Sequence, residues 1–435
     1  MSDGNGLVSC EERSPYAPRS ASSFPLSFIA LLAGLAVIAG AQSQWPGDPE
    51  WALLCGGGVV CAVIAVVDLA VFKVNRRSST GLAQTPSWPL SLADAAQRFL
   101  GLLLTLMAVG LAYWLLPEYR GGFYQPYWHF LRVLAWPVLC SAPLYFLWIG
   151  QRLEARRDAY LKLGGLLLGR GWREIDAEAL RSHALTWGVK AFFLPLMVVY
   201  LERKIASTGA AWRMLMLLNS GLYDFLFELT YLIDLLFCVL GYLVTLRVLD
   251  THVRSTDRTV LGWGAALICY QPFYAVLESS YVKYDDSGIG WEAWVSGHPV
   301  VHAIWGAAII ALSAIYALST VSFGLRFSNL TNRGIITSGP YRFLKHPAYI
   351  SKNLSWWLIS VPFISHAGGM EAVRHCALLL LFNGVYFVRA RTEERHLSQD
   401  PAYQVYSSWI RENGVFSKLR GRLGLQVYGP TYPHG

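Results

Sequence analysis

FPLSFIALLAGLAVIAGA, residues 24–41, is the first of many long apolar runs in this chain, and it contains no charged side chain. A helix needs roughly 20 apolar residues to cross a bilayer. The candidate runs are 24–41, 51–72, 99–117, 128–149, 184–201, 226–248, 260–277, 299–325, 348–366 and 371–390. Backbone polar groups in lipid must be satisfied within the segment, so we expect helices and not open strands.

Composition agrees with this interpretation. Of the 435 residues, 54% are hydrophobic and 15% are charged, whereas soluble domains carry about 25% charged residues. The sequence therefore predicts an all-α fold, a polytopic transmembrane helical bundle of about 8–10 spans, because the two shortest runs could instead be buried or re-entrant.

The positive charge gathers in alternate loops between the apolar runs. The basic residues of these loops are Lys73, Arg76, Arg77, Arg152, Arg156, Arg157, Lys162, Arg170, Arg173, Arg247, Arg254, Arg258, Arg326, Arg333, Arg342, Lys345, Arg389, Arg391 and Arg395. The intervening loops, such as 42–50 and 283–294, are leaner in cations or acidic. This positive-inside pattern predicts a multi-pass integral membrane protein with both termini and residues 339–349 in the cytoplasm. No basic patch lies away from the membrane-flanking loops, which argues against nucleic acid as a partner in spite of the net charge of +8.

Three regions follow from the distribution of apolar runs and motifs. Residues 1–23, rich in serine and proline, are expected to be a disordered cytoplasmic tail. Residues 24–255 are expected to form an N-terminal transmembrane region of about six spans, and residues 256–435 a C-terminal core with a cytoplasmic tail. Residues 212–224 are interpreted as an interfacial or re-entrant piece, and Asp176 as a helix N-cap. Whether the first span is cleaved as a signal peptide is left open.

The seven cysteines include no CxxC pair, so we expect neither a disulfide framework nor a metal site.

Several ionisable residues fall inside the predicted spans, where each costs a few kcal/mol unless it is paired or faces a cavity. They are Asp68, Arg132, Lys190, Asp224, Glu228, Asp234 and Glu278. Asp224 and Glu228 are four residues apart and share a helix face. One hypothesis is a polar pocket for a lipid headgroup or an ion path. The other is interhelical pairing, for instance with Arg132 or Lys190, or placement at a membrane interface.

GPYRFLKHPAY, residues 339–349, interrupts this apolar chain. Gly-Pro breaks the incoming helix, and Pro347 suits the first turn of a new one. The backbone amides of a helix N-terminus favour an anionic group, and Lys345 and His346 strengthen that preference. Tyr341 and Tyr349 offer flat faces for a base or a cation.

A second dense stretch, 389–406, follows the last apolar run. Glu393 and Glu394 are adjacent carboxylates that can bind an amine or a ribose diol. The last two predicted spans form a hairpin, so the carboxylates and residues 339–349 are expected on the same side of the membrane. Anion, cation, diol and aromatic recognition together are what S-adenosylmethionine requires.

The order of these motifs resembles the isoprenylcysteine carboxyl methyltransferase and phospholipid methyltransferase superfamily of integral membrane enzymes. The resemblance covers about 320–412 and consists of Gly339-Pro340-Tyr341, Lys345-His346-Pro347-x-Tyr349, Glu393-Glu394-x-x-Leu397 and Tyr403-x-x-Tyr406. It implies a methyltransferase that uses S-adenosylmethionine and takes a lipid or lipid-linked acceptor from the bilayer, with a carboxylate, amine or hydroxyl as the methylated group. The implied donor-binding residues are Gly339, Tyr341, Lys345, His346, Pro347, Tyr349, Glu393 and Glu394. The expected catalytic residues are Glu394, Arg391 and His346.

The chain departs from the family pattern at two places. Lys345 stands where an arginine is usual, and lysine lacks the bidentate fork of arginine. Ile350-Ser351-Lys352-Asn353 replaces a frequent glycine. Two other functions are kept as alternatives: a sterol-reductase-like oxidoreductase that binds NADPH, and a non-enzymatic transporter that uses Asp224, Glu228 and Asp234.

Overall fold

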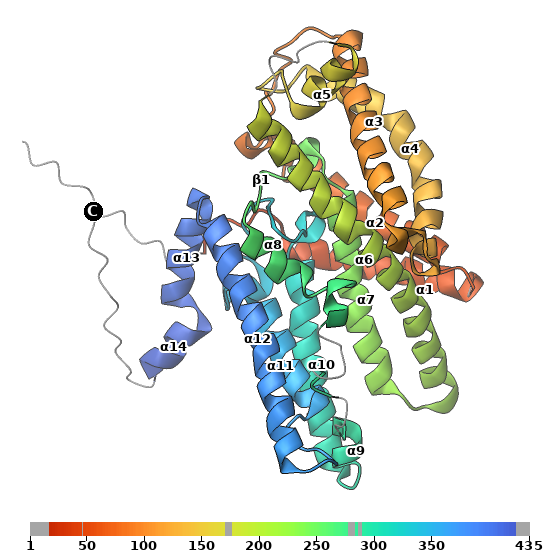
Figure 1. Ribbon diagram of the computed structural model, residues 1–435, viewed down its shortest axis with the longest axis vertical. Coiled ribbons are helices and arrows are strands. Elements are labelled where there is room, and N and C mark those ends of the chain that lie inside the picture. Colours follow the sequence, from red (N-terminus) through yellow and green to blue (C-terminus); the bar gives the residue numbers. More distant parts are fainter. Residues whose placement is uncertain (1–16, 46, 170–175, 277–282, 286–288, 423–435) are drawn as a thin grey trace, which may run out of the picture.

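The computed structural model describes residues 17–45, 47–169, 176–276, 283–285 and 289–422 (Figure 1). Its α-helices are α1 (Phe24–Gln44), α2 (Pro49–Ala70), α3 (Leu92–Leu115), α4 (Gln125–Gly150), α5 (Ala159–Leu167), α6 (Ala177–Leu218), α7 (Leu222–Leu243), α8 (Val260–Leu267), α9 (Trp291–Val295), α10 (Pro299–Val321), α11 (Pro347–Ser360), α12 (Gly369–Leu397), α13 (Pro401–Asn413) and α14 (Val415–Arg422). The strands β1 (Ser255–Thr256) and β2 (Thr331–Asn332) pair antiparallel. The 3₁₀ helices are η1 (Val74–Arg76), η2 (Ser78–Thr80), η3 (Pro117–Arg120), η4 (Gly122–Tyr124), η6 (Arg247–Leu249), η7 (Phe273–Val276), η8 (Gly324–Arg326) and η9 (Gly339–Arg342).

Eight helices of the described chain are long and apolar enough to cross a membrane. They are α1, α2, α3, α4 with its preceding turn, α6, α7, α10 and α12. The prediction of an all-α, polytopic membrane protein is thereby confirmed, at the lower end of the expected number of spans.

Two predicted spans are not continuous helices. The run 260–277 begins as α8, which has 8 residues, and a turn at 268–272 leads to η7. Its Pro272 cannot donate the hydrogen bond that a continuing helix needs. The run 348–366 contains α11, which has 14 residues and stops where Val361 adopts a left-handed conformation (φ 44°) before Pro362.

The interpretation of 212–224 as a separate re-entrant piece was wrong, while an interfacial location stays a prediction. Residues 212–218 continue α6, a helix of 42 residues, and left-handed Asn219 and Gly221 then turn the chain into α7. The predicted N-cap is confirmed, because the Asp176 carboxylate accepts a hydrogen bond from the Glu178 backbone amide at 3.0 Å.

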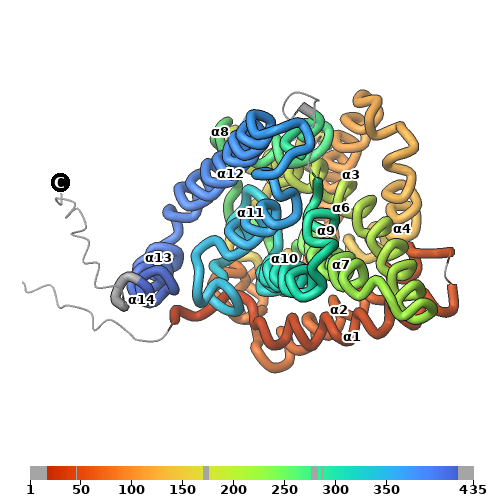
Figure 2. Tube along the Cα trace, turned by 90° about the horizontal axis from the view of Figure 1, so that it is seen from below, coloured from red at the N-terminus to blue at the C-terminus, as the bar shows by residue number. Residues whose placement is uncertain are grey.

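The helices gather around a core made mainly by α1, α2, α6 and α7. Phe193, Leu196, Leu236 and Phe237 are fully buried there. In both views α3 and α4 lie at one edge and α13 at the other, with α7 and α10 between them (Figure 2). The C-terminal helices α10, α11 and α12 lie side by side, with α9 at their lower end and α13 at their upper end (Figure 1).

The ionisable residues inside the spans mostly have partners on neighbouring helices. Glu228 pairs with Lys204 of α6 at 2.7 Å, so interhelical pairing holds here with a different cation from Arg132 or Lys190. The two carboxylate oxygens of Asp234 accept hydrogen bonds from Tyr316 at 2.6 Å and Thr320 at 2.5 Å. Asp68 lies 4.0 Å from Arg326, and the Lys190 ammonium donates a hydrogen bond to Thr245. Asp224 and Arg132 are exposed. Glu278 lies outside the described residues.

The N-terminal segment contacts the C-terminal part of the chain directly. The Ala21 amide donates to the Ile335 carbonyl at 2.9 Å, and the Thr337 amide donates to Ser20 Oγ at 3.2 Å. Residues 17–23 are thus ordered, contrary to the expected disordered tail, whereas residues 1–16 lie outside the described chain. The expected boundary between 255 and 256 falls inside β1, because Ser255 pairs with Asn332 and Thr256 with Thr331.

Candidate functional site

The two motif stretches meet at the upper end of the C-terminal helices. Residues 339–349 form η9 and the first turn of α11, and residues 389–406 form the last turns of α12 and the start of α13. Pro347 is the first residue of α11, as the sequence predicts, and His346 is its N-cap. The hydroxyl of Tyr406 donates to the Tyr341 carbonyl at 2.8 Å, which fixes α13 to η9.

Glu394 joins the 339–349 loop to α12. His346 Nε2 lies 2.8 Å from Glu394 Oε1, and Lys345 Nζ lies 3.1 Å from Glu394 Oε2. Arg391 Nη1 is 3.5 Å from the same carboxylate, but its side chain is 68% exposed. The Glu394 carboxylate is therefore already bound by His346 and Lys345 of the loop, and the side chain of Arg391 is largely exposed to solvent.

Glu393 has a different environment from its neighbour. The hydroxyl of Tyr349 donates to Glu393 Oε2 at 2.8 Å, and the Tyr349 ring stacks on His346 with a centroid distance of 5.6 Å. No cation of the described residues forms an ion pair with Glu393 within 4.0 Å. Glu394 thus has a cationic partner, Lys345, whereas Glu393 is hydrogen-bonded only to the hydroxyl of Tyr349.

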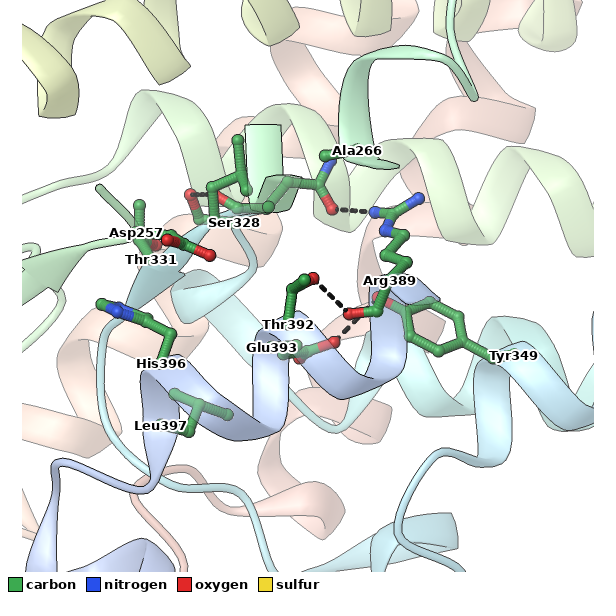
Figure 3. Close-up of a pocket in the computed structure, with 13 residues that line it drawn as sticks. Asp257, Ala266, Ser328, Thr331, Tyr349, Arg389, Thr392, Glu393, His396 and Leu397 are labelled. Atoms are coloured by element: carbon green, nitrogen blue, oxygen red, sulfur yellow. Dashed lines mark hydrogen bonds between the residues drawn. The ribbon is translucent and has the colours of Figure 1, made fainter. Parts of the chain in front are cut away.

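A pocket with about 430 Å³ of empty space, continuous with solvent, lies beside Glu393 (Figure 3). The pocket is lined by Asp257, Gly262, Ala266, Ser328, Asn329, Leu330, Thr331, Tyr349, Arg389, Thr392, Glu393, His396 and Leu397. In the close-up, Asp257, Thr331 and His396 lie on one side, Arg389 and Tyr349 on the other, and Glu393 between them.

Only some of the expected donor-binding residues reach this pocket. Tyr349 and Glu393 line it. Gly339, Tyr341, Lys345, His346, Pro347, Arg391 and Glu394 are not among its lining residues. These seven lie in η9, at the start of α11 or on the neighbouring face of α12, where they shape and connect the loop.

Arg389 is the pocket residue whose importance the sequence analysis understated. Its guanidinium is 7% exposed, donates to Asn329 Oδ1 at 2.5 Å and lies 5.3 Å from the Tyr349 ring centre. No carboxylate of the described residues lies within 4.0 Å of it. Its position beside Glu393-Glu394 in the sequence was an available signal, whereas Asp257, Asn329 and Thr331 reach the pocket only through the pairing of β1 with β2.

The tyrosines of α13 and η9 are neutral hydrogen-bonding groups. Burial, followed by the nearby carboxylates, raises the pKa of Tyr341 and Tyr403 well above the ordinary value of a phenol. The Tyr403 hydroxyl is buried and has no hydrogen-bond partner among the described residues. Thr331 Oγ1, on the pocket wall, is likewise without a partner there. Of the two, only Thr331 is among the residues that line the pocket.

Gly339 has a structural reason for being glycine. It adopts φ 61°, and a Cβ there would meet Ser322 Oγ and approach Phe24 Cδ2 to 2.9 Å. We expect Gly339→Ala to destabilise the protein by about 1–3 kcal/mol through backbone strain and this contact. Gly368→Ala is the matched control, since Gly368 also has a positive φ (99°) but no atom within 4 Å of the added Cβ. Thermal unfolding in detergent should show the larger loss for Gly339→Ala; equal losses would contradict a steric role for Gly339.

Comparison with known proteins gives one match. Residues 300–399 match the model of the isoprenylcysteine carboxyl methyltransferase (ICMT) family, whereas no curated protein and no solved structure matches the chain. The matched range contains α10, η9, α11 and α12, and it ends before Tyr403 and Tyr406. The resemblance inferred from the motifs is confirmed for this range. Residues 300–399 are therefore similar to the isoprenylcysteine carboxyl methyltransferase family, and the rest of the chain has no such match.

Proposed function

We propose that this protein transfers a methyl group from S-adenosylmethionine to a lipid or lipid-linked acceptor whose methylated group is a carboxylate, an amine or a hydroxyl. The observation that carries the proposal is a pair of opposite, unmatched charges on one pocket wall within the family domain. Glu393 has no cation and Arg389 no carboxylate within 4.0 Å among the described residues.

This pair of charges suits the amino-acid end of S-adenosylmethionine, which carries an ammonium and a carboxylate. Arg389 would hold the carboxylate by charge-assisted hydrogen bonds, and Glu393 the ammonium or the ribose diol. Tyr349, already bonded to Glu393, would hold that carboxylate in position for the donor. The hydroxyl of Thr331, which has no partner among the described residues, would be a further polar contact in the same pocket. The residues present therefore fit the donor.

Bound S-adenosylmethionine would supply a methyl group activated by its sulfonium. The protein's own task is to hold the acceptor atom in line with that methyl and to exclude water. A carboxylate acceptor needs no base, whereas an amine or hydroxyl must lose a proton. His346, hydrogen-bonded to Glu394 at 2.8 Å, is the proposed proton acceptor in that case. Arg391, at the exposed edge, is proposed to orient an acidic acceptor.

The roles of Gly339, Tyr341, Lys345, Pro347 and Glu394 are proposed as positioning. The bond from Lys345 to Glu394 and the cap at Pro347 hold η9 and α11 in the arrangement that presents Tyr349 and Glu393. We further propose that residues 256–435 form the catalytic region and residues 24–255 an N-terminal region, with the pocket and both chain ends on the cytoplasmic side. The acceptor would enter from the bilayer.

The two alternatives find less support. The pocket lining contains a single arginine, whereas the phosphates of NADPH favour several bidentate contacts. Glu228 is paired with Lys204, Asp234 is hydrogen-bonded by α10, and Asp224 is exposed. A transporter would need these three carboxylates to line one path.

Cofactor binding tests the proposal directly. S-adenosylmethionine and NADPH are titrated side by side into the purified full-length protein in detergent, with binding followed by calorimetry. We expect saturable binding of S-adenosylmethionine alone, and incorporation of its labelled methyl group into a membrane lipid extract. Binding of NADPH alone would support the reductase alternative instead, and binding of neither cofactor would refute the proposal.

A further inference from the structure

Lys352 is a cation inside the C-terminal helices that the proposed donor site does not use. It lies in α11, five residues after Pro347, which places it about 7.5 Å further along the helix axis than the start of the helix. Its ammonium lies among three aromatic rings, 5.0 Å from the centre of Tyr316, 5.4 Å from Trp356 and 5.9 Å from Tyr386.

This ammonium lacks a hydrogen-bonded or ionic partner among the described residues. No carboxylate lies within 4.0 Å of Nζ there. Asp234 interacts with Lys352 through its charge, but no oxygen of Asp234 lies within 4.0 Å of Nζ, and these oxygens accept hydrogen bonds from Tyr316 and Thr320. An ammonium has three donors, and ring faces offer it only about 0.5–2 kcal/mol of cation–π attraction. The side chain is half-buried and not sealed, so a ligand can reach it.

A structural role alone does not require a charge at this position. The neighbouring Asn353 and Asn383 already join α11 to α12 through a 2.6 Å hydrogen bond, and Trp357 donates to Asn383 at 2.8 Å. A charged group in the interior of a membrane protein is costly and usually marks a ligand site or an ion path. The Lys352 ammonium therefore has the charge and the free donors to bind an anionic ligand.

The Tyr386 ring connects this cation to the donor pocket. It contacts Tyr349 edge to face at 5.5 Å, and both Arg389 and Lys352 lie 5.9 Å from its centre. Arg389 and Tyr349 line the pocket, while Lys352 does not. Lys352 and Arg389 therefore lie near the same ring, Arg389 in the pocket lining and Lys352 outside it.

We propose that Lys352 is an anion-binding residue for the methyl acceptor, so that the enzyme selects membrane amphiphiles carrying an oxyanion. This inference rests on the proposed function, because it assigns the acceptor to the interior side of the donor pocket. The oxyanion is either a lipid phosphate or a carboxylate, and Lys352 forms its ion pair from within the ring of Tyr316, Trp356 and Tyr386.

The test is binding of three tritiated single-chain probes to the full-length protein in detergent: oleate, oleoyl lysophosphatidate and monoolein. Wild type is compared with Lys352→Met, which keeps the apolar stem, with Lys352→Arg, which keeps the charge, and with Lys162→Met, which removes a lysine from α5 outside the site. We expect wild type to bind at least one anionic probe at least tenfold more tightly than monoolein. Lys352→Met should lose that preference, while Lys352→Arg and Lys162→Met keep it.

The two anionic probes separate the sources of the oxyanion. A Lys352-dependent preference for lysophosphatidate alone assigns a phosphate, for oleate alone a carboxylate, and for both a general oxyanion site. Equal binding of all three probes by wild type, or an unchanged preference in Lys352→Met, would overturn the proposal. If Lys352→Met does not fold, the wild-type preference and that of Lys352→Arg decide the matter.

Binding of S-adenosylmethionine is measured on the same samples. We expect it to change less than twofold in Lys352→Met, because Lys352 does not line the donor pocket. If the wild-type protein does not bind S-adenosylmethionine, the proposed function is refuted whatever the lipid probes show. Intact donor binding without anion preference would refute only the role of Lys352.

Discussion

Replacement of Glu393 by Gln is expected to weaken binding of S-adenosylmethionine by about 10- to 150-fold and to reduce methyl transfer at least as much. Glu393 is the carboxylate that the loop leaves unmatched, and Tyr349 donates to it at 2.8 Å. Glutamine keeps the shape and can still accept from Tyr349, but it loses the charge that would hold an ammonium. Hydrogen bonds to charged groups contribute about 1.5–3 kcal/mol each, which gives the expected range.

The matched control is Glu371→Gln at the opposite end of α12. Unlike Glu393, Glu371 is ion-paired, at 2.6 Å to Arg374, and it does not line the pocket. Donor affinity by calorimetry and thermal unfolding should be measured on both variants. Full donor affinity in Glu393→Gln, or a loss of affinity in Glu371→Gln of the same size, would remove Glu393 from the donor site.

Replacement of Arg333 by Met is expected to prevent stable folding. The Arg333 guanidinium is 2% exposed and donates to the backbone carbonyls of Gly241, Val244, Thr251 and Phe327. Gly241 and Val244 lie at the C-terminal end of α7, where helix carbonyls lack intrahelical donors. Methionine would leave four buried carbonyls unsatisfied, and at about 1–3 kcal/mol each the loss is at least about 4 kcal/mol, a large part of the stability of a typical protein.

Arg411→Met, at an exposed position in α13, is the control for loss of one arginine. Size-exclusion chromatography and thermal unfolding in detergent should show aggregated or strongly destabilised Arg333→Met beside a control that behaves as wild type. A monodisperse Arg333→Met protein with an unchanged melting temperature would show that the α7 carbonyls find other partners.

Arg333 also shows how a sequence pattern can be interpreted correctly at one level and incompletely at another. As a member of a basic loop cluster it supports the positive-inside pattern. Its position inside the protein, bonded to carbonyls at the end of α7, at Thr251 and at nearby Phe327, depends on where α7 ends and where β2 pairs with β1. Charge patterning does not contain that information.

The sequence by itself determined the fold class, the motif order and the start of α11. Apolar length is a local property, so most of the long helices, such as α1 and α10, were predictable from hydropathy. Proline chemistry is equally local, and Pro347 begins α11 as expected. The spacing of Gly339-Pro340-Tyr341, Lys345-His346-Pro347 and Glu393-Glu394 was sufficient to identify the family that the domain at 300–399 matches.

Only the tertiary structure decided which apolar runs are interrupted and which polar groups share a pocket. Hydropathy does not detect the breaks near Pro272 and Pro362, because the residues around them stay apolar. It also does not show that residues 212–218 continue α6. Adjacent Glu393 and Glu394 look equivalent in sequence, but successive residues of a helix point about 100° apart. Glu393 therefore lines the pocket, whereas Glu394 contacts Lys345 and His346. Asp257, Asn329 and Arg389 meet because β1 pairs with β2 beside α12, and contacts of that sequence separation depend on packing, which no local pattern encodes.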